Sequence, residues 1–174
     1  MRWQDVLESL YRKRSGELVK AVEGMTVAEL KKRPAPGANP VGWLAWHVSR
    51  SMDRFVGDIV LGEQFWTRDG WHAKFRRDPD PHDTGMGHTD EQVDALYIPD
   101  AGTLLGYHAV VSGPMFKYLH ELTEEELERP HASLLYPAGE TRPVHTRIGP
   151  TDFLHVGQAH YARGMVKGHR WTGA

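Results

Sequence analysis

The sequence predicts an all-α protein, a four-helix bundle that forms one domain over residues 1–174. Three observations lead to this prediction. Four long segments carry apolar residues at steps of three and four, the spacing of a helix with one buried face. The chain is long enough to bury a sizeable core but too short for two average domains. The connections over 63–100 and 129–149 are longer than a minimal bundle needs.

The first two long helices have clear ends in the sequence. The first is expected over residues 3–23, and Gly24 should end it because glycine accepts the left-handed backbone found after a helix. The second should begin with Asn39 as its N-cap and Pro40 in its first turn. Gly62 should end it.

The other two long helices are expected over 100–122 and 150–167. Pro114 lies inside the first of these and should kink or break it. Residues 130–149 should form either a loop or a short β-hairpin before the last helix. The stripe expected to face the core from the last helix is Leu154/His155, Gln158, Tyr161/Ala162 and Met165.

Composition excludes several classes of function. The net charge is −2, so there is no basic excess for binding nucleic acid. No run approaches the ~20 apolar residues of a membrane span, and no signal peptide is visible, so a cytoplasmic protein is expected. Cysteine is absent, which excludes disulfides, thiolate metal sites and a cysteine nucleophile within this chain.

Three of the eleven histidines, His47, His108 and His155, fall on the apolar stripes of different helices. A buried imidazole needs a hydrogen bond or a metal ion, because burying it without a partner is costly. Each of the three could be a satisfied core histidine. Alternatively, histidines on facing helices could hold a metal ion inside the bundle.

A faint internal repeat favours the metal interpretation for one pair. Residues 25–34 resemble residues 122–130, and each segment precedes a loop and a helix that starts at a proline. His47 and His155 lie at corresponding places in those two helices. We therefore expect this pair to hold a divalent metal ion. Neutral imidazoles suit zinc, nickel, iron or copper, and zinc or nickel is the ion expected here.

Other polar residues are candidates for catalysis. His88 follows two glycines in the long loop, so it could close over a pocket. Asp152 precedes His155 by three residues and could share its helix face. His108 completes this group of candidate catalytic residues.

Several short motifs, taken in order, resemble the DinB/YfiT-like superfamily, and in particular the small stand-alone DinB-like proteins of mycothiol-using bacteria. They extend over nearly the whole chain. They are NPVGWLAWHVSRSMD at 39–53, GW at 70–71, GMGH at 85–88, GYH at 106–108, FLHVGQA at 153–159 and YARG at 161–164.

The resemblance implies a four-helix bundle that holds a divalent metal with three histidines. One would be His47, and two would lie four residues apart on the last helix in a His-x-x-x-His-x-Gly-Gln pattern. His155 and Gln158 match the end of this pattern, but Thr151 stands where the first histidine is expected. Asp152, His108 or His88 could replace that ligand, or the metal could be weakly bound or lost. Family members often form homodimers.

Three functions compete at this stage. The resemblance implies a metal-dependent enzyme that acts on a small-molecule substrate with an external thiol such as mycothiol, as a transferase or isomerase. The absent third ligand favours instead a non-catalytic small-molecule-binding or stress-response protein with a degenerate metal site. A structural dimer with stacked core histidines is the third reading.

Overall fold

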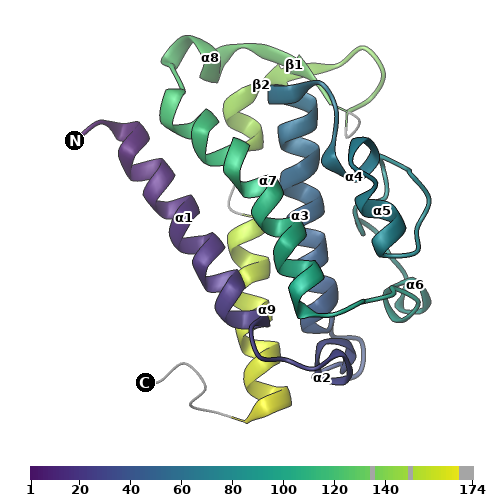
Figure 1. Ribbon diagram of the computed structural model, residues 1–174. Coiled ribbons are helices and arrows are strands. Elements are labelled where there is room, and N and C mark those ends of the chain that lie inside the picture. The colour runs from purple at the N-terminus through teal and green to yellow at the C-terminus, as the bar shows by residue number, and fades with distance from the viewer. Residues whose placement is uncertain (134–135, 149–150, 169–174) are drawn as a thin grey trace.

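The computed structural model describes residues 1–133, 136–148 and 151–168, with side chains in the last range from Phe153 onward. Four long helices form the predicted bundle: α1 (Trp3–Val22), α3 (Val41–Val56), α7 (Ala101–Glu121) and α9 (Thr151–Lys167). Figure 1 shows them running roughly side by side, with the short elements gathered at the ends and along one side.

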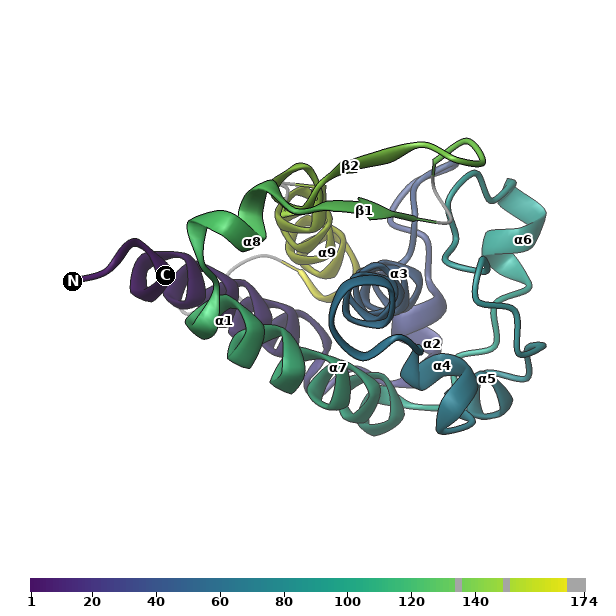
Figure 2. The same cartoon turned by 90° about the horizontal axis from the view of Figure 1, so that it is seen from above.

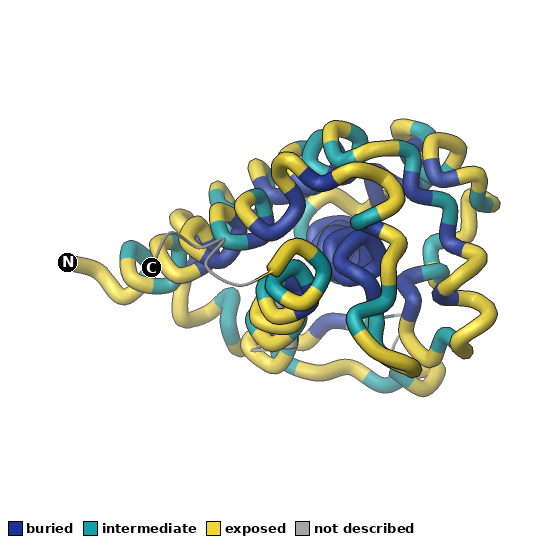
Figure 3. Tube along the Cα trace, turned by 90° about the horizontal axis from the view of Figure 1, so that it is seen from below, coloured by how far each residue is buried: buried dark blue, intermediate teal, exposed yellow. Residues whose placement is uncertain are grey.

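Helix α3 lies at the centre of the bundle. It packs against α7, α9, α1 and the short helix α2 (Val27–Lys31). Ser51 is its one residue that is not buried. Figure 3 shows this helix as the dark core inside partly exposed neighbours. A helix buried on every side must satisfy each of its polar side chains inside the protein, and this requirement shapes the site.

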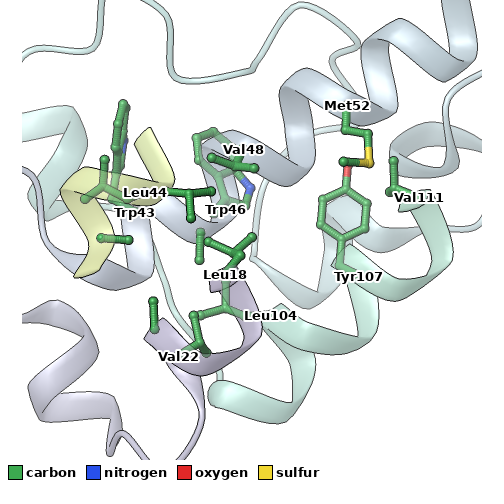
Figure 4. Packing of buried hydrophobic residues seen from close by; sticks show 14 of the residues in the cluster. Leu18, Val22, Trp43, Leu44, Trp46, Val48, Met52, Leu104, Tyr107 and Val111 are labelled. Carbon is green, nitrogen blue, oxygen red and sulfur yellow. The ribbon is translucent and has the colours of Figure 1, made fainter. Parts of the chain in front are cut away.

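The apolar core is centred where α1, α3 and α7 meet. Leu18, Leu44 and Leu104 contribute one side chain from each helix, and all three are almost completely buried. Burying a leucine contributes roughly 1.5–3 kcal/mol relative to leaving it in water. Tyr107 and Trp46 extend this core toward the 63–100 connection (Figure 4).

Short elements fill the long connections. A π-helical turn, η1 (Gly57–Leu61), extends α3 until Gly62 ends it with a φ of +79°, as predicted. The antiparallel pair β1 (Pro130–Ala132) and β2 (Thr141–Pro143) confirms the hairpin alternative, with His131 opposite Arg142. Figure 2 shows the pair lying across the end of the bundle. The remaining elements are α4 (Phe65–Arg68), α5 (Trp71–Lys74), α6 (Asp90–Asp94), α8 (Glu124–Glu128) and the 3-10 turn η2 (Val144–Arg147).

Three expectations were wrong in detail. Pro40, and not Asn39, is the N-cap of α3, so this helix begins one residue later than expected. Pro114 does not break α7, because packing against α1 and α3 outweighs the lost backbone hydrogen bond. The stripe expected to face inward from α9 lies largely outside: Leu154, Tyr161 and Met165 are 65%, 74% and 50% exposed. Of the expected stripe only Ala162 is buried, and the other buried residues in the described part of α9 are Val156 and Ala159.

A buried ion pair on α3 organises the 63–100 connection. Arg50 and Asp53 are fully buried, and Arg50 Nη1 lies 3.2 Å from Asp53 Oδ2. The same carboxylate accepts the backbone N–H groups of Phe65 and Trp66 at 2.9 and 2.8 Å, which fixes the start of α4. It also accepts the Tyr107 hydroxyl from α7 at 2.6 Å.

Arg50 donates through the rest of its guanidinium to the loop before residue 85. Its Nε donates to the Asp83 carbonyl at 2.9 Å, and Nη2 donates to the Pro81 carbonyl at 3.2 Å and to Gln64 Oε1 at 3.0 Å. The Tyr107 hydroxyl accepts from Nη1 at 3.1 Å. One buried cation therefore joins α3, α7 and two points of the loop.

Within the described parts of the chain, no helix is long and apolar enough to cross a membrane.

We predict that Asp53→Asn destabilises the fold by about 3–5 kcal/mol, because it leaves the Arg50 guanidinium buried without its counter-charge. Urea unfolding followed by circular dichroism measures this loss. Asp69→Asn is the matched control, since Asp69 pairs with Arg68 on the exposed surface and should change the unfolding free energy by less than about 1 kcal/mol. Equal small losses in both variants would contradict a structural role for the buried pair.

Candidate metal centre

His47 is held by the backbone of the loop that crosses α3. Its Nδ1 lies 2.5 Å from the carbonyl oxygen of Thr84. A carbonyl oxygen only accepts, so the proton of the neutral ring lies on Nδ1 and a lone pair is left on Nε2. Metal-ligating histidines are commonly oriented by such a bond from the other ring nitrogen.

The environment also keeps His47 uncharged. The pKa of the His47 imidazole is lowered to about 4, chiefly by burial; the hydrogen bond to the Thr84 carbonyl opposes this shift, and the neighbouring His155, Arg54 and His88 contribute to it. At neutral pH the ring is therefore neutral. A neutral imidazole is the form that binds a metal ion.

His155 reaches the same place from α9. The centres of the His47 and His155 rings lie 4.8 Å apart, with the rings at 82° to each other. His155 Nδ1 lies 2.8 Å from the side-chain oxygen of Gln158, one turn along the helix. That amide oxygen accepts, so His155 has the same tautomer as His47. Each histidine thus presents Nε2 as its unshared nitrogen.

Glycine is required where the loop passes over His47. Gly85 has a φ of +87°, which residues with a side chain rarely adopt. A Cβ at this position would lie 2.8 Å from the Trp46 ring, 2.9 Å from the Trp43 ring and 3.2 Å from His47 Nδ1. The backbone can therefore reach His47 only because no side chain stands here.

The structure places His88 beside His47, with both ring nitrogens engaged. Trp43 Nε1 donates to His88 Nδ1 at 3.3 Å, so the ring proton lies on Nε2, which is 3.4 Å from Asp83 Oδ1. The His88 ring also stacks on Trp46 with centres 5.8 Å apart. In this arrangement the His88 ring packs against Trp43 and Trp46 close to His47. The catalytic role predicted for it stays a prediction.

His108 lies on another side of α3 from the pair. Ser49 Oγ donates to the Ala45 carbonyl at 2.8 Å, so it accepts from His108 Nδ1 at 3.2 Å, and His108 Nε2 accepts the Ser15 hydroxyl at 2.7 Å. Ser49 follows His47 by two residues, which is about 200° around a helix. The bonding of His108 is that of a satisfied core histidine.

Asp152 and Thr151 lie in the first turn of α9, and their side chains are outside the described residues. The ligand role predicted for Asp152 is therefore still a prediction. Among the described residues there is no group of three or more histidines and carboxylates arranged to hold a metal ion. The described part of the centre is the pair His47 and His155.

The comparisons identify the family. A model of the DinB superfamily matches residues 10–162. The chain belongs to the DinB superfamily. A conserved protein from Enterococcus faecalis is similar in structure, with a TM-score of 0.78 and 26% sequence identity over 97% of this chain and 99% of that one. A DinB-like protein from Bacillus cereus ATCC 10987 shares the fold, with a TM-score of 0.51 and 14% identity over 96% of this chain and 90% of its own. No curated protein matches this chain.

Two partners of the DinB histidine pair were not found from sequence. Thr84 acts through its backbone carbonyl, which any residue carries, so only the neighbouring glycines could have pointed to it. Arg54 lies seven residues after His47 on the same face of α3, and it donates to Thr84 Oγ1 at 3.4 Å. Residues seven apart lie two turns apart on one face of a helix, so this spacing could have indicated that Arg54 lies on the same side of α3 as His47.

We predict that His108 makes the fold less stable in mild acid. Burial lowers the pKa of His108 to about 4, whereas an unfolded histidine has a pKa of about 6.5. Between these values the unfolded chain binds more protons, so stability is complete above pH 6.5 and is lost as the pH falls toward 4. His108→Gln does not titrate and should lose about 2 kcal/mol less than the wild type between pH 7 and pH 5.

Urea unfolding at the two pH values measures this difference. His120→Gln is the control, because His120 is an exposed histidine on the same helix. Parallel losses of stability in the wild type and His108→Gln would show that His108 binds its proton as readily in the fold as in the unfolded chain, against the bonding described.

Proposed function

We propose that this protein binds a divalent metal ion, with zinc or nickel expected, through His47 and His155, and that the metal takes up a small external thiol. The observation that supports this most is the shared tautomer of the pair. Each ring donates from Nδ1 to an oxygen, Thr84 O or Gln158 Oε1, and keeps Nε2 for another partner. Two imidazoles from facing helices suit a borderline metal ion.

The chain's own residues would then hold and orient the site. His47 is fixed by the Thr84 carbonyl, and Gln158 aims His155 from one turn further along α9. Partners of this kind raise the basicity of a ligating imidazole and set its orientation. A centre with two protein ligands also leaves coordination positions for water or an incoming ligand.

A bound metal would supply one piece of chemistry, which is to lower the pKa of a thiol and stabilise its thiolate. The thiol must come from outside, because the chain has no cysteine. A thiolate nucleophile next to a small-molecule electrophile corresponds to a thiol-dependent transferase or isomerase, and mycothiol is the thiol implied by the sequence resemblance. Arg54 is buried near the pair and adds positive charge that favours an anionic sulfur.

One observation favours a second function. Thr151 occupies the position where the resemblance places a third histidine, and the described residues contain no three-ligand group. A centre that binds metal too weakly for catalysis would leave a DinB-like protein that binds a small molecule without transforming it.

We predict that the protein, purified without a histidine tag or added metal, carries close to one equivalent of divalent metal by mass spectrometry. His47→Ala and His155→Ala should abolish it, because each removes one of the two described ligands. Gln158→Leu should weaken metal binding about 10–100-fold, since it frees the His155 ring. His120→Ala should retain the metal.

A wild-type protein that is empty and takes up neither zinc nor nickel on reconstitution would overturn the metal centre. It would leave the second function, in which the bundle binds a small molecule without metal.

We predict that mycothiol raises the melting temperature of the metal-loaded protein by roughly 5–10 °C at a ligand concentration 100 times its Kd. Mycothiol disulfide is the matched control, because it has no free sulfur to coordinate. The effect should disappear in His47→Ala. Equal stabilisation of the wild type and His47→Ala would place thiol binding outside the metal centre.

A further inference from the structure

A groove beside α9 shares a side chain with the histidine pair. It has a volume of about 470 Å³, which lies in the range of small-molecule sites. The loop over residues 34–39 forms one wall, and α9 forms the other through Gly157, Gln158, Tyr161 and Met165. Gln158 also accepts the hydrogen bond from His155 Nδ1. Leu44, three residues before His47, lies at the inner side.

The wall opposite α9 is fixed without any ligand. Ala38 N donates to the Ala35 carbonyl at 3.1 Å and closes a turn. Arg33 donates to the Ala38 carbonyl at 3.1 Å and is itself paired with Asp94 at 2.7 Å. Because this wall is already ordered, a ligand that enters the groove does not lose binding free energy to the ordering of the loop.

Gly157 is a helix glycine that packing does not require, as are Gly16 in α1 and Gly113 in α7, but of these three only Gly157 lines the groove. It lies inside α9, where glycine costs helix stability relative to alanine. A Cβ on Gly157 would meet nothing within 4 Å, so no part of the described chain needs the space. The empty space belongs to the groove. A glycine here keeps that space open for something that approaches the helix closely.

The chemistry of the lining indicates what could enter. None of the described residues that line the groove is charged, and its polar groups are the amides of Asn39 and Gln158 and the Tyr161 hydroxyl. The remaining lining is apolar or backbone. A charged ligand would lose its hydration there without gaining a counter-ion, whereas an uncharged apolar group loses little.

We propose that this groove binds the uncharged, largely apolar body of the small-molecule substrate whose reactive end meets the His47–His155 pair, and not the polar external thiol. This inference rests on the proposed function, which it extends from the metal centre to the ligand's body. The apolar side chains that α9 exposes, Tyr161 and Met165, then form one side of a ligand site. Gln158 connects the two halves, because it lines the groove and orients His155.

The first test uses the neutral fluorescent probe N-phenyl-1-naphthylamine on metal-free protein. The wild type should bind it saturably at one site. Gly157→Leu should weaken binding at least tenfold, because the new side chain fills the groove, while leucine is a stronger helix former than glycine. Tyr161→Ser should also weaken binding. Gly16→Leu is the matched control, since Gly16 is an exposed glycine in α1 with nothing within 4 Å of its Cβ.

Equal binding by the wild type and Gly157→Leu, or no saturable binding at all, would overturn the proposal. So would a wild-type dimer, measured by light scattering, that fails to bind the probe and dissociates in Gly157→Leu. That result would assign the face to a second copy of the chain.

The second test connects the groove to the histidine pair. On zinc-loaded protein, 1-hexanethiol should bind at least tenfold more tightly than ethanethiol, and Gly157→Leu should remove most of this difference. His47→Ala should lose hexanethiol binding but keep the fluorescent probe. If the probe binds and hexanethiol shows no advantage, the connection to the pair is wrong. If no metal loads and the probe still binds, the proposed metal function fails while the groove stands.

Discussion

The buried guanidinium of Arg50 is the interaction on which the rest of the structure depends. An arginine can donate five hydrogen bonds and cannot lose its charge inside a protein, so burying it requires an acceptor for every donor. Here those acceptors are a carboxylate, a phenol, an amide and two backbone carbonyls. Because the carbonyls belong to Pro81 and Asp83, the long connection can run in few other ways over α3. The Arg50 guanidinium therefore fixes the position of the loop backbone through its hydrogen bonds to these two carbonyls.

The chemistry of the candidate site follows from that placement. Once Asp83 is fixed on Arg50, the next carbonyl along the chain, that of Thr84, reaches His47. Burial alone does not mark His47 as a ligand, since His108 is equally buried and both pKa values are lowered to about 4. The difference lies in the second nitrogen. His108 has hydroxyl partners on both nitrogens, whereas His47 is bonded through Nδ1 to the Thr84 carbonyl and its ring lies 4.8 Å from that of His155, centre to centre.

The sequence predicted the bundle well because helical periodicity is a local signal repeated over many residues. It placed α1, α7 and the hairpin, and it identified His47 and His155 as neighbours from their equivalent positions in a faint repeat. It misjudged α9, because a periodic apolar stripe shows that a helix has two faces but not which one meets the core. The role of Thr84 was not predicted, since backbone carbonyls carry no sequence signature beyond the glycines that follow, and the loop path depends on a buried ion pair.

The two histidines of the pair differ in how firmly they are held, and this difference has a consequence for function. His47 sits on a helix buried on every side, under a loop that admits only glycine at residue 85. His155 is half-buried on α9, which also exposes Leu154, Tyr161 and Met165, and an exposed glutamine orients it. A ligand that contacts α9 can therefore change the orientation of His155 at little cost while His47 stays fixed. The candidate site thus combines one firmly held histidine with one adjustable histidine, and Gln158, which orients the adjustable one, lines the groove.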